Sequence, residues 1–572
     1  MHLLDWVVLL GTLIFIASYG VYKTRGSKNV KDYIGGGKDA HWWTIGISVM
    51  ATQASAITFL STPGQAYHDG MGFVQFYFGL PIAMVIICMV FIPIYHRLNV
   101  FTAYEYLESR FDLKTRTLTA LLFLVQRGLA AGITIFAPAI ILSAVLGWDL
   151  NTLTILIGVI VIIYTVSGGT KAVNVTQKQQ MAVMFGGMFA AFFLIVSYLP
   201  DNISFSNALQ IAGANGKMDI LDFSFDLENR YTFWSGIIGG TFLALSYFGT
   251  DQSQVQRYLT GKSVKEMQLG LIFNGLLKVP MQFFILLVGV MVFVFYQFNQ
   301  APLNFNPAAH EAVLNSDYAG EYRELMETNK SLQDEKQITA IRFGESLEDP
   351  TNIENDNYLS TMKDLDAAEI QNRERARELI KAANGTVETN DKDYVFIHFI
   401  LNNLPRGLIG LLLAVILSAA MSSTASELNA LGSTTTIDLY KRNVRKEKTD
   451  EHFVKMSKLF TLGWGIVAII FASFASLFDN LIQLVNIIGS IFYGNVLGIF
   501  LLAFFIKQVK SNAVFIAALI TQSIVVLLYM YEVMPYLWLN LVGCLLVMVI
   551  AYILQGIIHS PGREIPPGEI GE

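Results

Sequence analysis

Long apolar segments, separated by short polar loops, follow one another along most of the chain. A helix of roughly 20 apolar residues can cross the hydrocarbon core of a bilayer, and about thirteen segments reach this length. Since a membrane span must satisfy its backbone hydrogen bonds internally, the pattern predicts an all-α polytopic membrane protein. The predicted spans are residues 4–22, 43–62, 73–96, 116–146, 151–168, 178–199, 232–250, 268–297, 406–440, 454–477, 481–506, 512–529 and 534–557.

Basic residues gather in alternate loops between these segments. The linker 23–41 holds five Lys/Arg residues, and a second basic cluster lies within 441–458. Loops on the other side hold none: 63–72, 147–150, 478–480 and 530–533. Because positively charged loops stay on the cytoplasmic side, we expect a multi-pass protein of the plasma (inner) membrane. Its N-terminus would lie outside and its C-terminus in the cytoplasm.

Two polar segments, 200–231 and 299–394, interrupt the apolar pattern on the predicted outer side. The second carries 20 Asp/Glu and 10 Lys/Arg, which makes it far more acidic than the chain as a whole, whose net charge is −6. It contains helical patterns with Glu and Arg as close neighbours. Two interpretations stay open: a lid or partner-binding cap, and a surface insertion that the fold tolerates.

Composition excludes several classes of protein. Only 15% of the residues are charged, against about 25% in typical soluble domains. Cys88 and Cys544 both lie in apolar spans, which argues against a disulfide framework or a cysteine metal site. There is no basic nucleic-acid patch and no Walker, HExxH or GxSxG motif. We therefore expect neither an enzyme nor a nucleic-acid-binding protein.

One predicted span, within residues 417–440, is unusually rich in hydroxyl groups. Its members Ala419, Ser422, Ser423 and Ser426 are spaced at i, i+3, i+4 and i+7, so they share one helical face. A row of small, oxygen-bearing residues suits a weakly held cation such as Na+. It equally suits close packing between helices through small residues, and the stretch alone leaves both interpretations open.

Two spans lose their hydrophobicity midway. In the first, residues 51–58 read ATQASAIT; the second, 232–250, contains three glycines and continues into Gly249, Thr250 and Asp251. Polar residues at membrane depth are expected where a helix unwinds and its carbonyls line a cavity. Two interrupted helices in corresponding positions indicate a secondary transporter built from inverted repeats, with its site near the membrane midplane.

Charged residues inside spans require partners or water, because each is costly in hydrocarbon. Arg127 lies about 16 Å along the helix that starts near Arg116. It would serve either as a counter-charge for an anionic substrate or as a structural partner of Glu427 or Asp251. Lys278 would either donate hydrogen bonds to a substrate or extend to a membrane interface.

Several motifs together resemble the sodium:solute symporter family, which includes sodium-coupled glucose, monocarboxylate, multivitamin, iodide and sialic-acid transporters. They are DYIGGGKDAHWW (32–43), SVMATQASAITFL (48–60), FTAYEYLESRF (101–111), YTVSGGTKAV (164–173), GTDQSQVQRYLTGKS (249–263) and the serine-rich span 417–440. The resemblance implies a LeuT-like core of two inverted five-helix repeats with extra terminal helices. The resulting division is 1–42, 43–199 (first repeat), 200–231, 232–298 (start of the second repeat), 299–394 (insertion), 395–506 (rest of that repeat) and 507–572.

The resemblance also implies site residues. A coupling Na+ would be bound by backbone carbonyls of the first core helix and by oxygen atoms of the eighth: Ala51, Ala54, Ala419, Ser422 and Ser423. The substrate positions would be Gln53, Thr58, Gln75, Phe76, Tyr77, Arg127, Asp251, Lys278 and Asn486. The chain departs from the family pattern at Gln177, where many members have an acidic residue, and at Ser253, where some have a gating tyrosine.

These features predict a sodium-coupled importer of a small hydrophilic solute that works by alternating access. A monosaccharide is the first choice for the solute, and a small carboxylate of the monocarboxylate or sialic-acid type is the alternative. A transporter-like sensor is a further alternative. The expected partners are the solute and the lipid bilayer, with a possible protein partner at the insertion 299–394.

Overall fold

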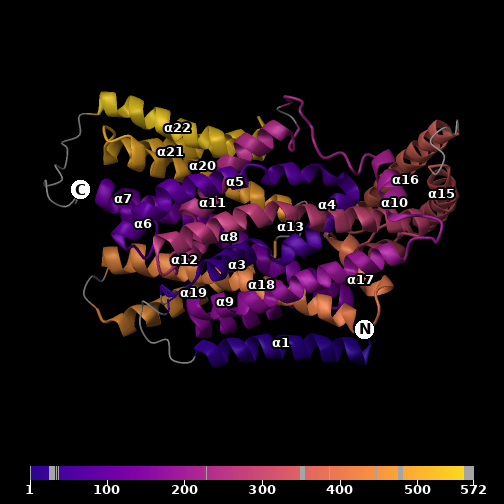
Figure 1. Cartoon of the computed structure of the whole chain (residues 1–572), viewed down its shortest axis with the longest axis horizontal. Coiled ribbons are helices and arrows are strands. Elements are labelled where there is room, and N and C mark those ends of the chain that lie inside the picture. Colours follow the sequence, from indigo (N-terminus) through magenta and orange to yellow (C-terminus); the bar gives the residue numbers. More distant parts are fainter. Residues whose placement is uncertain are drawn as a thin grey trace.

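The computed structural model describes residues 2–24, 33, 35–36, 38–226, 229–347, 354–385, 387–444, 448–474 and 481–558 (Figure 1). Within these ranges every regular element is a helix, and the one β-bridge joins Ala40 to Gly261. Most helices run roughly side by side along the long axis of the molecule, as Figure 1 shows. The predicted all-α class is confirmed.

The first half of the chain supplies the broken helix and the helices around it. Its elements are α1 (Leu3–Thr24), α3 (Trp42–Gln53), α4 (Ala56–Asp69), η1 (Met71–Tyr77), α5 (Leu80–Ile86), η2 (Ile87–Phe91), α6 (Ile92–Leu98), α7 (Glu105–Arg110), α8 (Leu113–Leu146), α9 (Leu150–Ser197) and α10 (Phe205–Ala214).

The second half repeats this arrangement of a broken helix followed by long helices. Its elements are η3 (Ser235–Gly239), α11 (Gly240–Thr250), α12 (Gln252–Tyr258), α13 (Val264–Phe298), α14 (Pro307–Leu314), α15 (Ala319–Ser346), α16 (Asn355–Ala383), η4 (Lys392–Tyr394), α17 (Val395–Asn403), α18 (Leu408–Thr434), η5 (Thr435–Val444), α19 (Asp450–Ala472), α20 (Leu481–Phe505), α21 (Ser511–Met530) and α22 (Tyr536–Ile557).

Nine helices of the described ranges are long and apolar enough to cross a membrane, or ten if α3 and α4 form one bent span. The total of thirteen therefore stays a prediction. Helix α9 is longer than one span needs. Its 48 residues would extend about 72 Å if straight, which is more than twice the thickness of the hydrocarbon core.

The contacts of α9 show that the chain reverses direction within it. Near its start, Gly158 packs on Ile469 and Ile162 on Gly465, so this part runs antiparallel to α19. Further along, Gln180 donates to the carbonyl of Ser418, and Gly187 packs on Leu412, so that part runs antiparallel to α18. Helices α18 and α19 both pack on α8, in opposite directions. Positions 127 and 134 of α8 contact 427 and 424 of α18, whereas positions 128 and 132 contact 464 and 468 of α19. The two ends of α9 therefore cross the molecule in opposite directions, as the predicted spans 151–168 and 178–199 require.

Both predicted helix interruptions are present. Helices α3 and α4 meet at Ala54 and Ser55 with a bend of 59°. Helices α11 and α12 meet at Asp251, which has extended backbone angles and accepts a hydrogen bond from the backbone N–H of Ser253. Short polar side chains favour such breaks because they bond to the local backbone in place of the helical pattern.

Helix α18 lies at the centre of the bundle and touches α1, α8, α9 and α19. Small residues allow close approach: Gly432 faces Thr461 and the carbonyl of Ser457, and Gly410 faces the backbone of Asp5. The hydroxyl-rich helix is thus deeply buried, and small-residue packing accounts for part of its composition.

The acidic segment folds as a group of helices at one end of the molecule, where α15, α16 and α10 lie together (Figure 1). Its interior holds a buried ion network in which Lys336 contacts Asp366 and Glu369, and Arg373 also contacts Glu369. Burial alone would raise the pKa of Glu369, but Lys336 and Arg373 outweigh it and lower that pKa to about 2. Glu369 therefore joins α15 to α16.

We predict that Glu369→Gln loosens the insertion, because it leaves two buried cations with one carboxylate fewer. Breaking such a network costs about 3 kcal/mol, which corresponds to roughly 100-fold faster local opening. Hydrogen exchange of α15 and α16 measures this opening. Glu374→Gln, an exposed position of the same helix, is the matched control. Equal exchange in both variants would contradict the assigned role.

Candidate functional site

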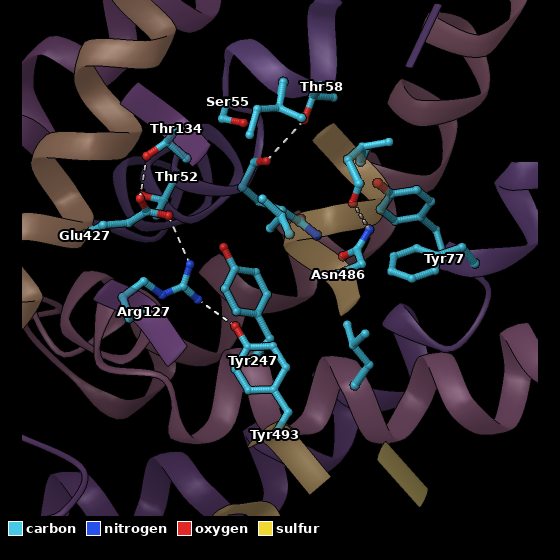
Figure 2. A pocket seen from close by; sticks show the side chains of 16 residues that line it. Thr52, Ser55, Thr58, Tyr77, Arg127, Thr134, Tyr247, Glu427, Asn486 and Tyr493 are labelled. Atoms are coloured by element: carbon cyan, nitrogen blue, oxygen red, sulfur yellow. Dashed lines mark hydrogen bonds and ion pairs between the residues drawn. The ribbon is translucent and has the colours of Figure 1, made fainter. Parts of the chain in front are cut away.

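A narrow cavity of about 90 Å³ lies beside the break between α3 and α4, enclosed by η1, α8, α11, α18 and α20 (Figure 2). Its lining includes six of the nine predicted substrate residues: Gln53, Thr58, Phe76, Tyr77, Arg127 and Asn486. Further polar and aromatic lining comes from Thr52, Ser55, Thr134, Tyr247, Glu427 and Tyr493. The cavity thus combines flat aromatic surface with several hydrogen-bonding groups.

The helix break gives this cavity its polar character. Helix α3 ends at Gln53, and the N–H of Ala54 still bonds to the carbonyl of Met50. The carbonyls of the last turn have no continuing helix to bond to. One of them, on Gln53, accepts a hydrogen bond from Thr58 Oγ1 at 3.3 Å, while Gln53 Oε1 is buried and has no hydrogen-bond partner among the described residues.

Arg127 forms the centre of a buried charged cluster at one side of the cavity. Its Nε lies 3.1 Å from Asp251 Oδ2, and its Nη1 lies 3.0 Å from Glu427 Oε1. Its Nη2 donates to Asp251 and, at 2.6 Å, to the hydroxyl of Tyr493. Figure 2 shows the guanidinium between Glu427 and Tyr493. Arg127 is thus paired with both partners that its structural interpretation suggested, and four of its five N–H donors are used.

The two carboxylates of this cluster are bound further. Thr134 donates to Glu427 Oε2 at 2.8 Å. Asp251 Oδ1 accepts from the backbone and the hydroxyl of Ser253, and its Oδ2 accepts from Tyr493 at 3.0 Å. With both acids ionised the cluster carries one net negative charge. Asp251, predicted to contact substrate, instead lies behind the cavity wall and holds Arg127 and the start of α12 in place.

Two other predicted substrate residues lie outside the cavity lining. Gln75 donates to the carbonyl of Tyr231 at 2.9 Å and accepts from the N–H of Asp222, so it fastens the loop that contains these two residues. Lys278 is fully buried and its ammonium lies 5.7 Å from the centre of the Tyr77 ring, with no hydrogen bond among the described residues. Lys278 therefore does not line the cavity itself, and it contacts the lining residue Tyr77.

The residues predicted to bind Na+ belong to α3, its break and α18, which pack against each other. Ala51 and Ala54 are buried at the end of α3. Ser423 donates to the carbonyl of Ala419 at 3.0 Å, whereas the buried hydroxyl of Ser422 has no partner in the described structure. The arrangement therefore offers carbonyl and hydroxyl oxygens on facing elements, as a Na+ site requires.

Gln177 joins these elements, a role that the sequence did not reveal. Its Oε1 accepts from Ser48 at 2.5 Å, and its Nε2 lies 3.0 Å from Thr52 Oγ1 and 3.4 Å from Ser426 Oγ. One amide on α9 thus links α3 to the serine face of α18. The sequence showed only that Gln177 replaces a usual acidic residue; an amide in an apolar span was the available signal.

Comparison with known proteins adds a family and a fold. The profile of the sodium:solute symporter family matches residues 33–326 and 376–521. Human sodium-coupled monocarboxylate transporter 1 is 37% identical over 273 residues, which are 47% of this chain and 44% of that protein. The human sodium/iodide cotransporter is 33% identical over a stretch of the same length, 42% of that protein. The match therefore spans less than half the length of these relatives.

Two further comparisons cover nearly the whole chain. The sodium/sialic acid symporter SiaT of Proteus mirabilis is 25% identical over 98% of this chain and 96% of its own. A solved structure of a Na+-coupled sialic acid symporter in a substrate-bound, outward-open state superposes with a TM-score of 0.74 at 24% identity. It covers 99% of this chain, all of the solved chain is matched, and the likeness confirms the LeuT-like fold.

We predict that Arg127→Gln destabilises the protein strongly, by about 3–5 kcal/mol, because it leaves Asp251 and Glu427 buried without a cation. Glu427→Gln is expected to be much milder, since the pair of Arg127 with Asp251 stays intact. Thermal unfolding of the purified variants measures the difference. Equal stability of the two variants would contradict the arrangement of charges described above.

Proposed function

The chain belongs to the sodium:solute symporter family, and from this premise we propose that it is a sodium-coupled secondary active symporter. It would import a small hydrophilic solute by alternating access between the two faces of the membrane. Inward movement of one Na+ releases about 2.3 kcal/mol per 100 mV of membrane potential, in addition to its concentration term. That energy is sufficient to drive uphill uptake of a neutral solute.

In this proposal Na+ binds between the end of α3 and the serine face of α18. The carbonyls of Ala51, Ala54 and Ala419 and the hydroxyls of Ser422 and Ser423 are its ligands. Support comes from the unpartnered hydroxyl of Ser422 and from the α3 carbonyls that lack helical donors. Both would be satisfied by a cation that joins the two helices. Bound Na+ would thereby hold the broken helix in the position that forms the solute cavity.

The charge of the cavity favours a neutral solute rich in hydroxyl groups, of the monosaccharide class. This inference depends on one observation: Arg127 is already paired with Asp251 and Glu427, so the cluster has no net positive charge to offer. An anion would have to displace a buried carboxylate. Hydroxyl groups, in contrast, both donate and accept, and they suit acceptors such as Gln53 Oε1.

Individual contacts follow from the lining. Asn486 donates to the carbonyl of Ile482 at 2.8 Å, which leaves its side-chain oxygen for the solute. Gln53 and Thr58 would bind hydroxyl groups from the broken helix. Phe76 and Tyr77 would stack against the apolar face of a sugar ring. Lys278 would act on this site through the ring of Tyr77.

A small organic anion is the second candidate. One N–H of Arg127 Nη1 remains unused, and the relatives named above include monocarboxylate, iodide and sialic acid transporters. One N–H supports a single hydrogen bond, not the bidentate contact by which arginine usually binds carboxylates. The neutral solute is therefore the better fit to this cavity.

For the ion site, we predict that Ser423→Ala raises the Na+ concentration needed for half-maximal uptake at least tenfold in proteoliposomes, because a ligand is lost. Ser523→Ala is the matched control: that serine makes the same bond to the carbonyl four residues back, but on exposed α21. Unchanged Na+ dependence in Ser423→Ala would contradict the assigned site.

For the solute, we predict that Na+-driven uptake of a neutral monosaccharide moves positive charge inward. Uptake of a monovalent anion with one Na+ would move none. Currents recorded during uptake from a panel of sugars and carboxylates distinguish the two candidates. Na+-driven uptake that occurs only with carboxylates and produces no current would exclude the sugar proposal.

Uptake measurements in proteoliposomes also test the residues assigned to the lining of the solute cavity. Asn486→Ala is expected to raise the KM for the solute at least tenfold without changing the Na+ dependence, because it removes a solute acceptor only. Asn402→Ala, whose side chain also bonds four residues back on α17, is the control. An unchanged KM in Asn486→Ala would remove this residue from the site.

A further inference from the structure

A second and larger chamber, of about 670 Å³, lies between the acidic insertion and the membrane helices. Helix α16 and Lys336 of α15 form its wall on the insertion side. The opposite wall consists of the end of α4 at 67–69, the turn 213–219 after α10, and Phe293 of α13. The family profile does not match residues 327–375, so most of the α16 wall lies outside the matched family pattern.

The chamber lining has an excess of positive charge even though the insertion as a whole is acidic. Its basic residues are Lys217, Lys336, Lys363, Arg373, Arg377 and Lys392, and its acidic residues are Asp69, Asp219, Asp366 and Glu369. The lining holds six cations and four carboxylates, and three of those carboxylates are already in ion pairs: Asp366 and Glu369 with Lys336, and Asp69 with Lys392. A fifth carboxylate, Asp391, lies outside the lining and forms ion pairs with Arg373 and Arg377. The acids therefore leave part of the positive charge without a counterion.

Three cationic groups of the lining keep unused hydrogen-bond donors. Nη2 of Arg373 is buried and forms no hydrogen bond to any residue that the structure describes, although Nε and Nη1 of Arg373 bond to Glu369 and to the carbonyl of Leu303. Lys363 forms no ion pair within the described part of the chain. Lys217 bonds to the carbonyl of His68, a neutral acceptor, at 2.5 Å. A buried donor without an acceptor is costly, so the chamber is incomplete as it stands.

Lys217 shares one aromatic ring with Lys336 and is fixed to the membrane helices. The ammonium groups of Lys217 and Lys336 lie 4.9 and 5.6 Å from the centre of the Phe293 ring. The carbonyl of Lys217 accepts from the N–H of Met71, directly after α4. A ligand held by Lys217 and α16 would therefore connect the insertion to the outer end of the broken helix.

We propose that this chamber is a binding site for a small oxyanion, a carboxylate or a phosphate group, held by Lys217, Lys363 and Arg373. The oxygens of such an anion accept charge-assisted hydrogen bonds from ammonium and guanidinium groups. This chamber shares no lining residue with the solute cavity. An occupied site ties α16 to the end of α4 and thereby stabilises one position of the broken helix.

Equilibrium dialysis of the full-length protein in detergent tests the proposal with radiolabelled inorganic phosphate and, separately, succinate. Chloride at equal ionic strength provides the background. We expect saturable binding of at least one probe, with one site per chain. Lys217→Gln combined with Lys363→Gln is expected to weaken it at least tenfold, and the exposed single variant Lys363→Gln to weaken it measurably.

The control removes two positive charges at exposed positions of α15 and α16 outside the chamber, Lys330→Gln with Lys381→Gln, and should bind as the wild type does. Absence of saturable binding of both probes, or equal binding in the Lys217/Lys363 variant, would overturn the proposal. The assay involves no transport, so its outcome is independent of the proposed symport.

Discussion

A helix that breaks inside a membrane leaves carbonyl groups that the bilayer cannot satisfy, and this constraint organises the protein. At the end of α3, Thr58 and the N–H of Ala54 donate hydrogen bonds to only some of these carbonyl groups. Partners for the other carbonyl groups must come from neighbouring helices, from an ion or from the solute. This explains why α18, a helix rich in serine and threonine, packs directly beside the break, and why an amide from Gln177 lies between the two.

The charged cluster around Arg127 imposes the second constraint. A buried guanidinium is tolerable only with its donors satisfied, and two carboxylates from different helices accomplish this. The cluster thereby joins α8, α12 and α18 on one side of the cavity. It also sets the charge available to a solute, so the same pairing that stabilises the bundle disfavours a simple anion.

Features that depend on the local sequence pattern could be predicted from the sequence. Fewer of the features that depend on the tertiary arrangement could be predicted in this way. Helical periodicity identified the face of Ala419, Ser422 and Ser423, and the polar run 51–58 identified the break. Charge alone indicated that Arg127 would find an acidic partner. Gln75 lies outside the cavity lining, because neighbours on a short 3₁₀ helix point in different directions and only the fold shows which face the cavity. The link made by Gln177 depends on residues 125 and 249 positions away, which no local pattern reveals.

Hydrogen exchange at the amides of residues 54–60 tests the central claim most directly, namely that Na+ joins the broken helix to α18. The exchange is compared in Na+ and in K+ at constant ionic strength, without solute. The account predicts that Na+ slows exchange at the break in the wild type, and that Ser422→Ala with Ser423→Ala abolishes the difference. Equal exchange in the two ions in the wild type, or protection by Na+ that persists in the double variant, would contradict it.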